Sequence, residues 1–355
     1  MPRPRPRPVG QAVSRRRAAP VLAVLALLAV AAAATHLVVA RQGPEAAAVL
    51  QHLLAMLGMA EPLGGPDGFV VGTIRLPRLL CALAGGASLG LAGAVMQAVF
   101  RNPLASPDVV GTAAGSALGG ATAIVLGWAA ASVLAVPLLS MAGAVLVTTL
   151  VFGLAGGGMR FSVTALLLAG IAMNTFTGAL TSFVVTFRFD NYTASSSVLF
   201  WLMGGLDART WDHVAITGGG MVVFALLLLP FVRDLDVLTL QDETVHSLGV
   251  DATRTRRLLL LFACGLTATT VANTGGIAFI GLVVPHMARL LVGPVHRVLL
   301  PASALLGALL LVLADFACRM APPDANLRLG VITSAIGAPY FLYLLARHRR
   351  GESLR

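Results

Sequence analysis

The chain is built mainly of long apolar stretches separated by short polar segments. After a first stretch at about 20–40, further stretches long enough to cross about 30 Å of hydrocarbon recur along the sequence. We place them near residues 77–99, 109–128, 132–153, 163–187, 213–232, 257–276, 277–293, 298–318 and 329–346. This pattern predicts about ten transmembrane α-helices.

Two regions are difficult to divide into spans. Between Asp108 and Arg160 the sequence carries no charge, so it must hold two crossings, with a break near Trp128 or Pro137. The region from Arg257 to Arg289 is tight for two spans, so one of them is expected to be short.

Composition agrees with a membrane protein. Apolar residues make up 57% of the chain and charged residues 11%, against about 25% charged residues in a soluble domain. The predicted fold class is therefore an all-α polytopic membrane bundle. The transmembrane domain is expected to span 20–346, between a basic Pro/Arg-rich tail (1–19) and a C-terminal tail (347–355). A cleaved signal peptide is the alternative for the first stretch, but the apolar run continues to Ala40.

The distribution of charge predicts the orientation. The net charge is +10, and every basic residue is Arg. Arginines gather in both tails, at Arg101 and Arg160, and in 233–257 and 289–297, whereas the intervening segments are balanced or acidic. The positive-inside rule then places both termini in the cytoplasm and requires an even number of spans. No nucleic-acid partner is expected, because the arginines lie in short runs between apolar stretches.

The chemistry missing from the sequence narrows the function. A P-loop needs a Lys to reach the nucleotide phosphates, and the sequence contains none. The chain is therefore not expected to be a self-contained ATP-driven pump, and ATP-powered transport would need another polypeptide. Asp315, near the end of a predicted span, is the one acid that we find within the spans, which disfavours an ion-coupled secondary transporter. No constellation of nucleophile, base or metal ligands suggests a membrane-embedded enzyme.

No cofactor or metal site is expected. Cys81, Cys264 and Cys318 lie in apolar segments without metal-ligand spacing, and we interpret them as packing residues. His286 stands alone beside Pro285 and is expected to pack or to form a hydrogen bond rather than to bind iron.

Glycines recur at a spacing that suits close helix contact. Gly86 and Gly90 are four residues apart, as are Gly111, Gly115 and Gly119. Such stripes let helix backbones approach in lipid, so they predict a tight bundle, and a seam between two subunits is a second use for them.

Several longer strings are specific enough to indicate a family. They are Arg75-Leu-Pro-Arg78 with the Gly-rich helix after it, Arg101-Asn-Pro-Leu-Ala105 followed by Gly111, the string Gly276 to Arg289, His296-Arg297 with Leu300-Pro301, Ala314-Asp315 with Arg319, and Gly330 with Gly337-Ala-Pro339. In this order they resemble the FecCD/BtuC family of ABC importer permeases, which take up ferric siderophores, haem or cobalamin. The resemblance spans about residues 70 to 346.

The resemblance implies an assembly. Two ten-helix permease subunits, identical or paralogous, would sit in the membrane on a dimer of ATP-binding subunits, and an extracytoplasmic substrate-binding protein would dock above. The positions that match the family's docking arginines are Arg75, Arg78 and Arg319. Arg75 and Arg78 are expected on the first helical turn of the second span, where they also suit docking to carboxylates of an external partner. Interfacial anchoring of the helix is the alternative.

The family also places a coupling helix in the segment 233–257. Residues Leu238 to Val250 predict a short helix that Gly249 ends. The residues expected to contact the ATPase are Leu240, Asp242, Glu243, Leu248 and Gly249. A solvated loop helix is the alternative.

Near the Asn-Pro turn, Gln97, Asn102 and Pro103 are candidates for the translocation pathway.

The chain departs from the family at two places. Gln241 and His246 replace a usual Gly and a usual basic residue. Asn326-Leu-Arg-Leu-Gly330 replaces a usual Glu-Leu-Pro-x-Gly, which puts the local turn in doubt, while Arg328 adds a positive charge to the docking face.

The cargo that the resemblance implies is a ferric siderophore, with cobalamin or haem as alternatives. For the function itself, the remaining alternative is an ion-coupled secondary transporter.

Overall fold

Within the residues that the structure describes, every regular element is a helix. The computed structural model describes residues 15–40, 44–156, 163–186, 192–322 and 325–349, so most of the two predicted tails lies outside it. The longer helices are α1 (Arg15–Val38), α4 (Leu76–Phe100), α5 (Thr112–Val125), α7 (Ala135–Gly156), α8 (Val163–Thr186), α10 (Trp211–Leu228), α13 (Ala252–Thr274), α14 (Ile280–Val292), α15 (His296–Met320) and α16 (Leu329–Arg349). The shorter ones are α2 (Ala46–Met56), α3 (Gly65–Phe69), η1 (Val70–Arg75), η2 (Pro107–Val110), α6 (Trp128–Ala131), α9 (Tyr192–Leu202), η3 (Leu229–Phe231), α11 (Val232–Leu238) and α12 (Asp242–Ser247).

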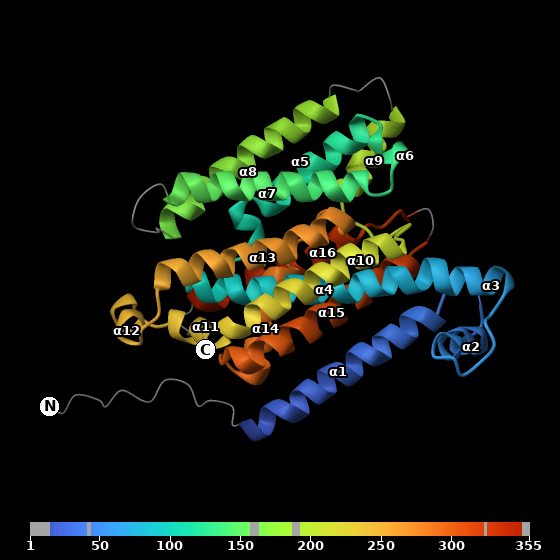
Figure 1. Ribbon diagram of the computed structural model, residues 1–355, viewed down its shortest axis with the longest axis horizontal. Helices are drawn as coiled ribbons and strands as arrows, with labels where there is room; N and C mark the ends of the chain where they lie inside the picture. Colours follow the sequence, from blue (N-terminus) through green and yellow to red (C-terminus); the bar gives the residue numbers. More distant parts are fainter. Residues whose placement is uncertain (1–14, 41–43, 157–162, 187–191, 323–324, 350–355) are drawn as a thin grey trace.

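The predicted polytopic helical bundle is confirmed. Seven helical segments within the described residues are long and apolar enough to cross a membrane. Helices α5 and α14 have 14 and 13 residues, so at about 1.5 Å per residue they fall short of a full crossing. The count of ten spans stays a prediction. Figure 1 shows that α1 begins at the end of the bundle where α11 and α12 lie.

The two difficult regions are divided by glycine-containing breaks. The uncharged stretch breaks at Gly127, in the left-handed conformation at φ +79°, and α7 begins at Ala135 with Pro137 in its first turn. Residues 275–278 form no helix, and α14 starts after Phe279, which is left-handed at φ +66°. The spans predicted at 109–128 and 277–293 are therefore shorter than expected, because α5 begins only after η2 and Gly111, and α14 only after the non-helical segment.

Helix α4 is the central element of the bundle. It is buried along nearly its whole length and contacts α10, α13, α14 and α15 (Figure 1). The expectation that Arg75 and Arg78 lie on a first helical turn is wrong, because the helix is continuous from Gly65 through Phe100. The π-helical turn η1 directly precedes Pro77, and its wider winding accommodates a ring that would clash with the preceding turn of an α-helix.

The predicted close packing of the glycines is found within the subunit. A Cβ atom at Gly86 would overlap the carbonyl oxygen of Gly307 on α15, and one at Gly115 would overlap that of Gly143 on α7. Gly111 differs, because it lies in the left-handed region at φ +85° before α5 begins. These glycines therefore pack helices of one chain together, and a seam between subunits is not needed to explain them.

Substituting Ala for Gly86 is expected to destabilise the bundle. The added methyl group would meet backbone atoms of Gly307 and Ala308 that cannot move as a side chain can, at a cost of about 1–3 kcal/mol. The matched control is Gly218→Ala on α10, where nothing lies within 4 Å of the new Cβ. Thermal unfolding in detergent should show a lower midpoint for Gly86→Ala only. Equal midpoints for the two variants would contradict the packing.

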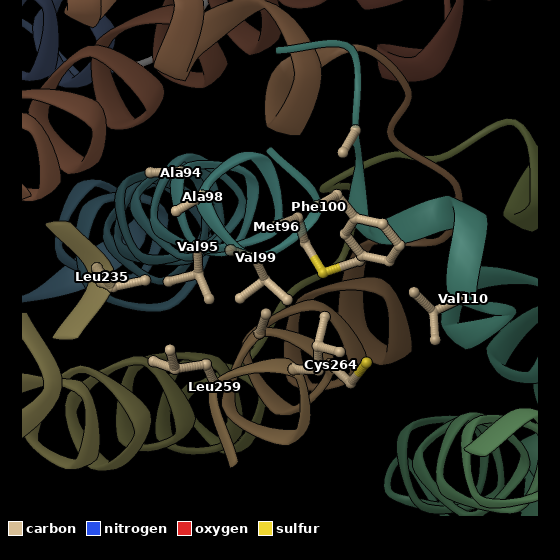
Figure 2. Packing of buried hydrophobic residues seen from close by; sticks show 14 of the residues in the cluster. Ala94, Val95, Met96, Ala98, Val99, Phe100, Val110, Leu235, Leu259 and Cys264 are labelled. Carbon is tan, nitrogen blue, oxygen red and sulfur yellow. The ribbon is translucent and has the colours of Figure 1, made fainter. Parts of the chain in front are cut away.

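A buried cluster joins α4 to the end of the bundle that carries α12. Figure 2 shows Val95 and Val99 of α4 facing Leu235 of α11 and Leu259 of α13. Leu235 and Leu259 are fully buried. Helix α11 is therefore packed directly against α4.

Two apolar helices remain largely uncovered by the rest of the chain. In α8, only 17% of the most apolar part of the helix is buried inside the chain, and in the segment Trp211–Leu238 only 11%. The corresponding share is 89% in the segment that contains α4. Apolar surface of this extent must face lipid or another subunit.

Candidate functional site

A buried carboxylate lies at the centre of an ionic network near the end of the bundle opposite α12. Asp315 on α15 is 1% exposed. Arg78 on α4 binds it in bidentate fashion, with Nε donating to Oδ2 at 2.7 Å and Nη2 donating to Oδ1 at 2.8 Å. His36 Nε2 of α1 lies 2.8 Å from the same Oδ2. The contact thus ties α1, α4 and α15 together, in the geometry that makes Arg–carboxylate pairs strong.

The network continues to the surface through a second carboxylate. Asp207, in the connection between α9 and α10, is 59% exposed on its side chain. Arg78 Nη1 donates to its Oδ1 at 2.7 Å, and Arg328 Nη1 donates to its Oδ2 at 2.9 Å. The Arg328 guanidinium also lies 4.4 Å from the centroid of the Phe200 ring. Asp207 therefore bridges two arginines on an accessible face.

The other two predicted docking arginines bind the carboxyl end of α1. Arg75 Nη1 donates to the carbonyl of Leu37 at 2.6 Å, and Arg319 donates to the carbonyls of His36 and Val39 at 2.8 and 2.6 Å. Carbonyls at a helix end lack intrahelical partners, and the helix dipole favours cations there. Arg75 is 5% exposed. Its contact with a binding protein stays a prediction, and its role in this conformation is to hold α1.

The sequence did not indicate these internal partners. The acceptors of Arg75 and Arg319 are backbone carbonyls, which leave no trace in residue identity. Asp207 belongs to one of the acidic segments between the arginine-rich ones, and nothing in the sequence marks it as a partner of Arg78. The one available signal was Asp315, since an acid within an apolar span needs a partner.

The turn in doubt at 326–330 is formed without Glu or Pro. Asn326 adopts a left-handed conformation at φ +44°, which Asn tolerates better than most residues. Beyond it, the amides of Leu329 and Gly330 donate to the carbonyls of Gly204 and Met203, at 3.2 and 3.0 Å. Arg328 is thereby positioned beside Asp207.

A cavity of about 570 Å³ lies next to this network. Its walls are mostly apolar and come from the segment after α9, the non-helical residues 276–278 and the start of α16, with Asp108 and Ser334 as polar members. The Gly205 amide donates to the carbonyl of Thr274 at 2.8 Å. The loop that carries Asp207 is therefore bonded to the cavity wall.

The three predicted pathway residues do not line this cavity. Gln97 is buried, its Nε2 donates to the Leu282 carbonyl of α14 at 3.0 Å, and its Oε1 has no hydrogen-bond partner within the described residues. Asn102 is exposed in the turn after α4, where its Oδ1 accepts from the Leu104 amide at 2.9 Å. The pathway role of Gln97, Asn102 and Pro103 stays a prediction.

At the opposite end, α12 projects as a short, closed helix. The single helix predicted over 238–250 is wrong in extent, because α11 ends at Leu238 and α12 runs only from Asp242 to Ser247. Thr239 separates them, since its Oγ1 donates to the Asp236 carbonyl at 2.6 Å and closes α11. The predicted end is confirmed: Gly249 is left-handed at φ +77°, and the Val250 amide donates to the Val245 carbonyl at 3.4 Å.

Four of the five predicted ATPase-contact residues are exposed, in α12 or directly beside it. Leu240 and Leu248 are 44% and 50% exposed, and Glu243 and Gly249 are exposed as well. Val245 is fully buried and anchors the helix to the body. The side chains of Asp242 and His246 lie outside the described set. Two exposed leucines beside one buried anchor form an apolar surface that a partner can cover.

Hydrogen bonds attach this segment to two long helices. Arg101, the left-handed residue that ends α4, donates from Nε to the Leu238 carbonyl at 2.8 Å. Asp236 Oδ1 accepts from the His296 amide at 2.9 Å and lies 2.6 Å from His296 Nδ1, at the start of α15. The segment before α12 is therefore bonded to the end of α4 and the start of α15, the same helices that hold Arg78 and Asp315.

Comparison with known proteins agrees with this architecture. Residues 27–347 match the FecCD transport family. The chain is 43% identical to a cobalamin import system permease protein of Halobacterium salinarum, over 78% of this chain and 73% of the relative. It is also 43% identical to an Fe(3+) dicitrate transport system permease protein of Escherichia coli, over 79% of this chain and 86% of the relative.

A solved structure gives the same result for the fold. A structure described as a metal-chelate type ABC transporter in an inward-facing conformation superposes with a TM-score of 0.80 at 31% identity, covering 93% of this chain and 99% of that chain. The chain is therefore an integral membrane permease and belongs to the FecCD transport family.

Proposed function

We propose that this permease moves ferric siderophores into the cell, driven by a separate ATPase dimer and supplied by an extracytoplasmic binding protein. A second permease subunit, either a copy of this chain or a paralogue, completes the transporter. The two relatives named above belong to transport systems for ferric dicitrate and cobalamin, and this supports a metal chelate as cargo. Cobalamin or haem is the alternative.

The observation that carries the proposal is the attachment of α12. An importer whose energy comes from another chain needs a rigid element on which the ATPase acts, and a link from that element to the membrane helices. Leu240 and Leu248, which flank α12 on either side, are exposed, and the segment before α12 is bonded through Arg101 at the end of α4 and through Asp236 to the start of α15.

The alternative of an ion-coupled secondary transporter has less support. Such a carrier needs an ionisable group that exchanges its partners within the membrane. Asp315, the sequence candidate, is already bound by Arg78 and His36, which is the arrangement of a structural ion pair.

For the pathway, we favour the cavity that includes Asp108 and Ser334. Its walls are apolar enough for a chelate to slide past without tight binding. It adjoins the loop of Asp207, and this supports a route by which docking above would alter the cavity below.

The proposed docking face consists of Arg78, Arg319 and Arg328, with Arg75 beneath them. Asp207 already occupies Arg78 and Arg328, so acidic side chains of a binding protein would compete with it. Removing this internal competitor, by Asp207→Asn, is expected to tighten docking by up to about fivefold, the range of exposed ion pairs. Arg328→Gln should weaken docking by a similar factor.

This docking prediction is checked by binding measurements on permease in nanodiscs with the binding protein that co-purifies with it. Arg254→Gln serves as the control, because Arg254 is exposed at the start of α13, at the other end of the bundle. Weaker docking of Asp207→Asn would contradict the competition, and an unchanged affinity of Arg328→Gln would remove Arg328 from the docking face.

The cargo is tested through the same binding protein. Its affinity for ferric siderophores, haem and cobalamin is compared under one set of conditions. Tightest binding of a ferric siderophore supports the proposal. Tightest binding of cobalamin or haem would contradict the proposed cargo and leave the importer assignment in place.

A further inference from the structure

A second cavity, larger than the first, opens at the end of the bundle that carries α12. Its volume is about 790 Å³, within the range of about 300–1,000 Å³ of small-molecule sites. Three parts of the chain form it: α4, the segment from α10 through η3 to α11, and the first three turns of α15. We call it the α10–α15 groove.

The walls of the α10–α15 groove are apolar. They include Leu91 of α4, Leu228 at the end of α10, Leu229 of η3, and Leu300 and Ala304 of α15. Leu229 is 63% exposed, and the segment that contains it is the least covered of the long apolar spans. The groove therefore opens on apolar surface that the described chain leaves uncovered, of the kind that lipid covers in a membrane protein.

The charged lining residues come from one place, the contact between α11 and the start of α15. They are Arg233, Asp236, His296 and Arg297. Asp236 is already engaged by the amide and ring of His296. Arg233 lies one helical turn before Asp236, and Arg297 directly follows His296, so the two arginines flank this contact.

The two arginines are exposed, and the structure gives neither an acidic partner among the described residues. With Asp236 as the one carboxylate in the lining, the rim keeps a net positive charge. A cationic rim at the end of an apolar groove matches a ligand with an anionic head and hydrocarbon tails. Clusters of basic residues at a membrane surface attract anionic lipids in this way.

We propose that the α10–α15 groove binds an anionic glycerophospholipid, with its phosphate between Arg233 and Arg297 and an acyl chain along Leu91, Leu228 and Leu300. The lipid would join α11 to α15 and so brace the segment that holds α12. The inference needs only that the chain lies in a membrane, and it stands whether or not the proposed cargo and partners are correct.

The test is native mass spectrometry of the intact chain in detergent, titrated with phosphatidylglycerol or with phosphatidylcholine of the same acyl chains. We expect phosphatidylglycerol to bind more tightly. The double variant Arg233→Gln/Arg297→Gln should weaken it about 30-fold, since each arginine near a lipid surface contributes about 1 kcal/mol. Arg254→Gln, at the same end of the bundle but outside the groove lining, is the control and should change nothing.

Two further arms separate the lipid from other anions. Ala304→Phe fills the groove without changing charge and should weaken phosphatidylglycerol as well, whereas excess inorganic phosphate should not displace it. Equal binding of the two lipids, or unchanged binding by the double arginine variant, would overturn the proposal. Displacement by phosphate alone would do so too, because it would indicate a simple anion site.

Discussion

Asp315→Asn is expected to lower the free energy of unfolding by about 3–5 kcal/mol, the cost of removing one partner from a buried ion pair. The amide keeps the shape of the side chain but not its charge. Arg78, which is 15% exposed, would lose its bidentate partner, and His36 would lose its acceptor. Because the network joins α1, α4 and α15, the loss should loosen three helices together.

Thermal unfolding of the purified protein in detergent measures this effect. Asp207→Asn is the matched control, since it removes the other carboxylate from the same arginine, but from a side chain that is 59% exposed. It should cost about 0–1 kcal/mol. Similar losses for the two variants would show that the buried pair does not have the structural role assigned to it.

Replacing both exposed leucines of the α12 region, as Leu240→Asp/Leu248→Asp, is expected to abolish ATP-driven uptake while leaving the bundle folded. These side chains are 44% and 50% exposed, and the anchor Val245 is untouched. Burying a leucine side chain contributes about 1.5–3 kcal/mol. Binding to the ATPase should therefore weaken by at least about 100-fold.

Uptake and ATPase association are measured together on the reconstituted complex. Leu57→Asp is the control, an equally drastic change at an exposed leucine after α2. A complementary variant, Asp242→Arg/Glu243→Arg, reverses the acidic start of α12 and should uncouple hydrolysis from uptake. Normal uptake by the double leucine variant would remove the coupling assignment from α12.

Apolar length and Arg placement were enough to predict the helical membrane class, because a bilayer leaves few alternatives for so little charge. The ends of the helices were harder to predict from the sequence. Gly249 was correctly predicted as a helix stop, since a left-handed residue after a polar helix favours Gly. The starts of α5 and α14 were missed, because buried non-helical residues such as 275–278 are as apolar as the helices beside them.

The candidate site was predictable only in part. The motif arginines were located, yet the partners of Arg75 and Arg319 are carbonyls of α1, which any residue could supply. Asp207 joins Arg78 across 129 residues of sequence, and only the folded bundle brings them together. The glycine stripe was identified correctly as a packing device, but its partner, Gly307 on α15, could not be read from spacing alone.

The most direct test of the central claim is uptake of a ferric siderophore into proteoliposomes that contain this permease with or without its ATPase partner. The binding protein and cargo are supplied on one side and ATP on the other. We predict uptake only when the ATPase and hydrolysable ATP are both present, and none from the permease alone under a proton or sodium gradient. Gradient-driven uptake by the permease alone would contradict the account and identify the chain as a secondary transporter.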